Sequence, residues 1–121
     1  GNYAQCFEWL DGNKSDEDRG GLFVSLQEER LIRAESAGAY VLGIVTSEPA
    51  FLGGANPFDS SGARREWAAV ALIGRVLGRD NGQCRPNGFC RPGPGGVAVP
   101  ASDGFRVLRR LSENTIELVL K

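Results

Sequence analysis

The side chains most able to do chemistry in this sequence are thiols and carboxylates, because the chain contains no histidine. Without imidazole, neither a Ser-His or Cys-His nucleophile pair nor a histidine-ligated zinc site can form. Cys84 and Cys90 bracket a turn-like segment. This spacing could close a small disulfide loop in an oxidising compartment, but it lacks the CxxC pattern of a metal site. Cys6 stands among aromatic residues, and we expect it to be a small buried hydrophobic residue.

Carboxylates gather near the start of the chain, at Glu8, at Asp11 and in the run Asp16-Glu17-Asp18. Paired carboxyl groups can serve as general acid and general base when their surroundings drive their pKa values apart. The acidic run, however, falls in a polar stretch over residues 11–21, whose composition indicates a solvated connection. For each of these residues a surface position is the more common role.

The remaining constellations favour structural roles over catalytic ones. A Ser-Lys dyad has little support, because Lys14 falls in the polar loop and Lys121 ends the chain. Arg64-Arg65 and Arg109-Arg110 could grip a phosphate or a neighbouring subunit's acidic loop, but paired arginines usually form a solvated face. Residues 92–96 lack the spacing of a phosphate-binding loop and indicate a turn. We therefore expect no cofactor and no metal.

Length and charge narrow the class of protein further. With 121 residues, 41% of them hydrophobic, the chain fits one domain over residues 1–121 with a real core. A net charge of -1 gives no basic surface for nucleic acid. The apolar stretches are too short to span a bilayer, and no signal-peptide pattern opens the chain. Because it starts directly before a strand-like run, we expect a fragment of a longer protein.

Short alternating segments in the first half of the chain predict strands. Residues 3–10 place aromatic side chains on one face of an extended segment. Residues 22–26 and 30–34 flank Gln27-Glu28-Glu29, and residues 39–46 supply β-branched and aromatic residues. We interpret residues 22–46 as a β-meander.

The second half continues the same pattern. Residues 67–77 form an apolar strand interrupted by Gly74, and Asn81-Gly82 predicts a hairpin turn after it. Residues 105–107 and 116–120 alternate around Ser112-Glu113-Asn114, which indicates a terminal hairpin, with a helix over residues 105–111 as the alternative. The predicted fold class is mainly β: a small single domain of short antiparallel strands and hairpins with long loops.

The longest loop, over residues 47–65, contains several Gly and Pro residues with Phe51, Leu52 and Phe58 among them. A connection of this length in a small domain is usually functional or in contact with another subunit. Its apolar residues favour subunit contact.

A series of short pieces, spread over nearly the whole chain, recurs in the same order in one known family. The pieces are Gly1-Asn2-Tyr3-Ala4-Gln5, Phe7-Glu8-Trp9, Asp11-Gly12-Asn13, Glu17-Asp18-Arg19, residues 21–24, 40–45, 72–74, 80–84 and 87–90, and residues 106–114. In this order they resemble the intramolecular-chaperone autoproteolytic domain of phage pre-neck-appendage and tail-spike-type proteins. No single piece is decisive, but their number in one order makes coincidence improbable.

The resemblance implies a C-terminal domain that forms a homotrimer, assists the folding of the upstream fibre or stalk of the same polypeptide, and cleaves that polypeptide near its own N-terminal edge. It also implies a virion appendage or an extracellular fibre as the location. Threefold contacts would come from residues 47–65 and from apolar strand faces. Self-cleavage in this family is thought to use a carboxylate pair, which would be aided by the tethering of the scissile bond.

The sequence departs from the family at the motif that should carry this chemistry. The family reads Asp-Tyr-Ala-Glu, whereas this chain has Asn2-Tyr3-Ala4-Gln5, so that amides replace both carboxylates. An amide cannot accept a proton as a general base does. We therefore predict that the domain does not cleave itself. The alternatives are an active single-turnover autoprotease that uses Glu8 or an upstream residue, and a passive tip domain that binds a ligand.

Overall fold

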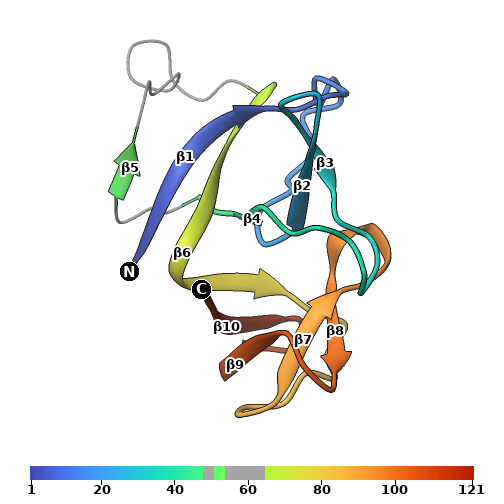
Figure 1. Cartoon of the computed structure of the whole chain (residues 1–121), viewed down its shortest axis with the longest axis vertical. Coiled ribbons are helices and arrows are strands. Elements are labelled where there is room, and N and C mark those ends of the chain that lie inside the picture. The colour runs from blue at the N-terminus through green and yellow to red at the C-terminus, as the bar shows by residue number, and fades with distance from the viewer. Residues whose placement is uncertain (48–50, 54–64) are drawn as a thin grey trace.

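The chain folds into a curled, mainly antiparallel β-sheet without α-helix among the described residues (Figure 1). This computed structural model describes residues 1–47, 51–53 and 65–121. Its strands are β1 (Asn2–Glu8), β2 (Phe23–Gln27), β3 (Arg30–Arg33), β4 (Gly43–Val45), β5 (Phe51–Gly53), β6 (Trp67–Arg79), β7 (Phe89–Pro92), β8 (Ala98–Ala101), β9 (Phe105–Ser112) and β10 (Thr115–Leu120). A short 3-10 turn, η1 (Pro94–Gly96), precedes β8. The predicted fold class is confirmed.

The 13-residue strand β6 connects the two halves of the sheet and bends near its middle (Figure 1). One edge of β6 pairs with β1. The other edge pairs first with β4, at Val70 and Ala71, and then with β10, from Gly74 to Arg79. Because one long strand serves three partners, β6 determines how the first and last strands lie relative to each other.

The β2–β3 hairpin forms where the sequence predicts it, but the predicted meander is wrong. β4 pairs with β2 and with β6, not with β3, so the chain returns past the hairpin to the other side of β2. Glu28 and Glu29 form the hairpin turn with positive φ values of 51° and 66°. Asn and Gly are the usual residues in such a turn, so composition alone marks this one poorly.

In the second half, the terminal β9–β10 hairpin is confirmed, and residues 105–111 belong to a strand instead of a helix. The hairpin predicted at Asn81-Gly82 is wrong. β6 pairs with β10, and the chain after Asn81 crosses to β7, which pairs with β8 and β9. Local turn composition could not reveal this pairing, because β10 is about 40 residues away in sequence.

Two clusters of buried apolar side chains form the core. Alternation along β10 points Ile116, Leu118 and Leu120 inward. They join the larger cluster with Phe23, Ile44, Ala71, Val76, Cys84, Cys90, Ala98 and Val107. The smaller cluster contains Trp9, Val24, Leu31, Val45, Ala68 and Val70. The first half of β6 is thus buried on both faces, whereas its second half keeps one face open.

Most of the loop predicted to contact other subunits lies outside the described residues, since residues 48–50 and 54–64 are not described. In the described part of the chain, no helix has the length and apolar character needed to cross a membrane.

Candidate functional site

Asn2, the first residue of the motif, lies at the start of β1 beside the bend of β6. Its Nδ2 donates to the backbone oxygen of Arg75 over 3.1 Å. Its Oδ1 is buried and accepts no hydrogen bond. Gly74 makes this approach possible, because a Cβ there would lie 2.5 Å from the Gly1 oxygen and 2.9 Å from Cα of Asn2. Asn2 is thus held by the backbone of β6 as a hydrogen-bond donor.

Gln5 points to the opposite face of β1. Side chains alternate along a strand, so Asn2 and the fully buried Ala4 face inward, while Tyr3 and Gln5 face outward. Gln5 Nε2 donates to the Tyr3 hydroxyl over 2.7 Å. Within one chain, therefore, the two amides do not come together as a pair.

Glu8 lies at the far end of β1, opposite Trp67 and beside Arg30, with 3.3 Å between the Arg30 Nε and the Glu8 Oε1. A strand advances about 3.3 Å per residue, so roughly 20 Å separate Glu8 from Asn2. Glu8 is thus not positioned to replace the missing carboxylate beside Asn2.

Cys84 and Cys90 are buried free thiols in the larger core cluster. Burial raises the pKa of the Cys84 thiol to about 12, and the negative charge of Asp80 adds to the effect. Burial likewise raises the pKa of Cys90 to about 12, with a smaller contribution from Cys84. Both thiols are therefore protonated at neutral pH and unsuited to nucleophilic attack. The disulfide between them stays a prediction.

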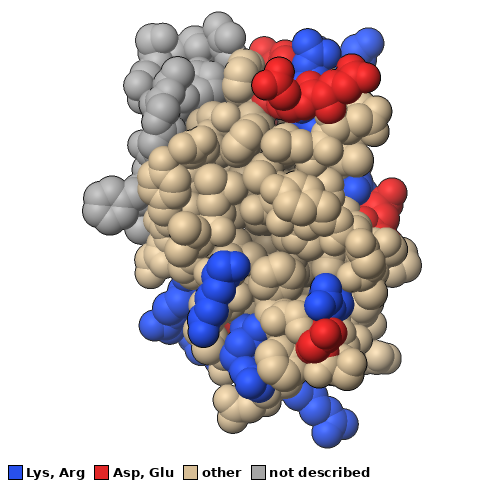
Figure 2. Space-filling view, in the orientation of Figure 1, with Lys and Arg blue, Asp and Glu red and all other residues tan. Residues whose placement is uncertain are grey.

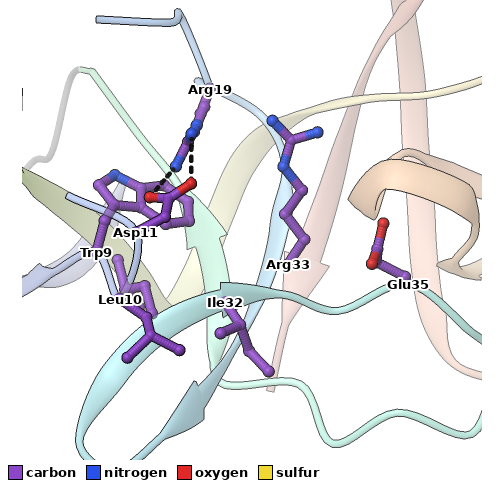
Figure 3. A pocket seen from close by; sticks show the side chains of 8 residues that line it. Trp9, Leu10, Asp11, Arg19, Ile32, Arg33 and Glu35 are labelled. Carbon is purple, nitrogen blue, oxygen red and sulfur yellow. Dashed lines mark hydrogen bonds and ion pairs between the residues drawn. The ribbon is translucent and has the colours of Figure 1, made fainter. Parts of the chain in front are cut away.

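A cavity of about 310 Å³ lies beside Trp9 and Arg19, between the loop after β1 and strand β3 (Figure 3). The guanidinium of Arg19 lies over the Trp9 ring, 4.5 Å from its centroid. It donates to both oxygens of Asp11, over 3.0 and 2.9 Å, and to Glu17 Oε1 over 3.0 Å. Arg33 at the rim also pairs with Glu17. All four charged groups thus have partners.

The prediction that residues 11–21 form a solvated connection holds for Asp11 and residues 14–18, which are exposed, but Asn13 and Arg19 are buried. Hydrogen bonds from the Arg19 guanidinium lower the pKa of Asp11 despite some burial, so this carboxyl stays charged. Asn13 is buried within the loop. Its Nδ2 donates to the backbone oxygen of Glu17, and its Oδ1 accepts a hydrogen bond from the Glu17 backbone N–H. The loop is therefore folded around Arg19, and its polar composition concealed this.

A second cavity, of about 820 Å³, lies over Cys84 and Arg110. Arg110 donates to both carboxylate oxygens of the fully buried Asp80, over 3.0 and 2.6 Å. It also donates to the backbone oxygen of Cys84 over 2.7 Å. Burial by itself raises the pKa of Asp80, but the hydrogen bonds from Arg110 and from the Cys84 amide outweigh it and lower the pKa.

Arg110 therefore does not share the solvated face predicted for Arg109-Arg110, although Arg109 does lie on the surface. The sequence analysis did not identify Arg19, Asp80 and Arg110 as residues whose ion pairs hold parts of the fold together. Each of them lies in a polar or charged stretch, so its residue type and neighbours alone did not distinguish it from a surface residue. Among the described residues, no group of three His, Cys, Asp or Glu side chains converges as a metal site.

Comparison with known proteins gives structural matches only. No family model matches the sequence, and no curated protein matches it. The fold is similar to the crystal structure of the C-terminal fragment of bacteriophage phi29 gene product 12, with a TM-score of 0.80 and 20% identity, over 99% of this chain and 100% of that one. It is equally similar to pre-mature bacteriophage phi29 gene product 12, also with a TM-score of 0.80 and 20% identity, but this chain spans only 21% of that protein.

Proposed function

We propose that this chain is the C-terminal assembly domain of a fibrous phage appendage protein, and that it trimerises and assists the folding of the chain before it. The observation that carries the proposal is the end-to-end match of this fold to a fragment from the C-terminus of a much longer phage protein. The order of short sequence pieces described above points to the same class of domain. A virion appendage is the location that this function implies.

The proposal includes the loss of self-cleavage. General acid–base cleavage of an amide bond needs a group that gives up and takes back a proton, and neither Asn2 nor Gln5 can do this. The contacts of both residues support a structural role, because Asn2 donates to the Arg75 oxygen and Gln5 donates to the Tyr3 hydroxyl. Self-cleavage through Glu8 has less support, because this residue lies at the other end of β1.

The position of Asn2 suggests how a carboxyl group would behave there. The Arg75 oxygen can only accept a hydrogen bond, so it favours a neutral donor such as an amide or a protonated carboxyl. An aspartate at position 2 would therefore have a raised pKa, as a general acid requires. The amide keeps the hydrogen bond and removes the proton transfer.

The test uses the domain expressed behind the natural sequence that precedes it. We expect the wild-type chain to remain intact on incubation and to sediment as a trimer at micromolar concentration. The doubly substituted variant Asn2→Asp, Gln5→Glu is the matched comparison, and mass spectrometry would locate any cut that it gains. Spontaneous cleavage of the wild-type chain would contradict the inactive assignment, and a monomeric wild type would contradict the assembly function.

A further inference from the structure

The second half of β6 and the strands beside it present an open face that mixes apolar and charged side chains. Tyr3 pairs with Ile73, and Leu77 aligns with Glu117 on β10, which aligns in turn with Arg109 on β9. We call these side chains, together with that of Arg75, the outer face: Tyr3, Ile73, Arg75, Leu77, Arg109 and Glu117. The opposite face of the same strands carries the buried Val76, Leu118 and Val107.

The apolar members of the outer face are large side chains that the strands leave exposed. Ile73, which pairs with Tyr3 of β1, is 60% exposed, and Leu77, which pairs with Glu117 of β10, is 44% exposed. The solvated face of an antiparallel sheet usually carries polar residues, because the apolar side chains alternate toward the core. An isoleucine and a leucine two positions on either side of Arg75 therefore form a stripe suited to contact with another protein surface.

The charged members of the outer face carry an excess of positive charge. Glu117 pairs with two guanidiniums: its Oε1 lies 2.9 Å from Nη2 of Arg75 and 3.1 Å from Nε of Arg109. The Glu117 side chain is only 12% exposed, whereas the arginines are 57% and 60% exposed. Two cations share one carboxylate, so the arginines keep donors free for a further acidic group.

The chain itself offers acidic groups at its other end. Figure 2 shows Asp and Glu side chains gathered at the upper end of the molecule, with Lys and Arg side chains beside them, where Figure 1 places the β2–β3 turn and the loop after β1. Glu28, Glu29 and Asp16 are exposed there. Identical outer faces placed together would bring like charges into contact. A contact between unlike surfaces, which generates a ring when the rotation closes, avoids this repulsion.

We propose that the outer face binds a second copy of this chain, with Ile73 and Leu77 buried in the contact and the excess charge of Arg75 and Arg109 met by the acidic end of that copy. The inference rests on the proposed trimer and names the surface that holds it together. Burial of two large apolar side chains supplies the affinity, while the charges set the orientation of the copies.

The test is sedimentation equilibrium of the whole chain at micromolar concentration. The double variant Ile73→Glu, Leu77→Glu removes both apolar side chains and adds two negative charges that the acidic end of the other copy repels, and we expect its dissociation constant to rise by about 100-fold or more. Tyr40→Glu is the matched control, because Tyr40 is 67% exposed and lies outside the outer face. It should associate as the wild type does.

A second double variant, Ile73→Thr, Leu77→Thr, places threonine, a β-branched residue that favours strands, at both positions while it removes the apolar contact, and far-UV circular dichroism checks that both variants fold. Loss of the trimer in the folded threonine variant supports the inference. A trimeric wild type with an equally trimeric threonine variant would overturn the inference and leave the proposed function intact. A monomeric wild type would overturn both.

Discussion

Asn2 and Leu120 flank the same residue of β6: both pair with Gly74, one on each side. Neighbouring strands lie about 4.8 Å apart, so the first and last strands of the domain are separated by only about 10 Å at this level. Figure 1 shows the two ends of the chain close together accordingly. A segment joined before Gly1 would thus emerge beside the C-terminal strand. Both β1 and β10 pair with Gly74, so the packing of these two strands against β6 depends on this glycine.

Gly74→Ala should therefore detach β1 from β6. The new Cβ would lie within 3 Å of backbone atoms of Gly1 and Asn2, and Gly74 has a φ of +107° that alanine rarely adopts. We expect a loss of roughly 2–4 kcal/mol in the free energy of unfolding, measured by urea denaturation.

Gly38→Ala is the matched control for that measurement. A Cβ at Gly38 meets no atom within 4 Å. Its effect should be within about 0.5 kcal/mol, or slightly stabilising. Equal effects of the two substitutions would show that the contact at Gly74 does not constrain β1.

Arg19→Lys should loosen the loop over residues 11–21. Lysine can neither bind both Asp11 oxygens in the planar geometry of a guanidinium nor stack on Trp9 in the same way. We expect the free energy of unfolding to fall by about 1–2 kcal/mol and amide hydrogen exchange in the loop to become faster.

Arg106→Lys is the comparison for the Arg19 variant, since Arg106 also stacks on an aromatic ring, 4.0 Å from the Phe89 centroid, but is exposed. Arg106→Lys should lower the free energy of unfolding by less than Arg19→Lys does, and it should leave amide hydrogen exchange in the loop over residues 11–21 unchanged. If Arg19→Lys leaves the exchange rates of the loop unchanged too, Arg19 is not the residue that holds it.

The β2–β3 turn should be a site of easy stabilisation. Glu28 and Glu29 both adopt positive φ values, which are unfavourable for glutamate, and their like charges are adjacent. Glu28→Asn, Glu29→Gly supplies the residues that this turn prefers. We expect the free energy of unfolding, measured by thermal denaturation, to rise by about 1 kcal/mol. The variant Glu28→Ala, Glu29→Ala removes the charges but not the backbone strain. A gain as large from the alanine pair would mean that charge, not backbone conformation, limits stability.

The sequence predicts the strands of this domain well where apolar and polar residues alternate, as in Ile116, Leu118 and Leu120 of β10. It predicts pairing less well. β4 lies beside β2 and β6 because tertiary contacts select those edges, and no local pattern encodes that choice. A glycine inside a strand can mark a close approach of another backbone, and at Gly74 that backbone is the start of β1.

The candidate site was predictable only in part. Asn2 and Gln5 were found by resemblance, but their placement on opposite faces of β1 follows from strand alternation. The Asp80–Arg110 pair joins residues 30 positions apart, and each alone has the composition of a surface residue. Such pairs become visible only when the topology brings β9 beside the end of β6 through β10.

The Asp80–Arg110 pair provides the last prediction. Asp80 is fully buried, so its carboxylate depends on Arg110 and on the Cys84 amide for its hydrogen bonds. Asp80→Asn should lower the free energy of unfolding by about 3 kcal/mol, since the amide cannot accept both hydrogen bonds that the Arg110 guanidinium donates. Arg110→Met should destabilise more than the double variant Asp80→Asn, Arg110→Met, because the single change leaves a buried charge without its partner. Additive effects of the two changes would contradict this coupling.

The pH dependence of stability gives the same pair a second test. The folded pKa of Asp80 is lowered below its ordinary value of 3.8, so the unfolded chain binds the proton more readily than the folded chain does. The stabilisation from this carboxylate is therefore present above about pH 4 and is lost as the pH falls through the folded pKa. Urea denaturation between about pH 2 and pH 6 should show a shallower loss of stability in Asp80→Asn than in the wild type. Because arginine also lowers the pKa of Glu117, part of the slope must remain in the variant. An unchanged slope would mean that Asp80 binds its proton equally well in the folded and unfolded chains.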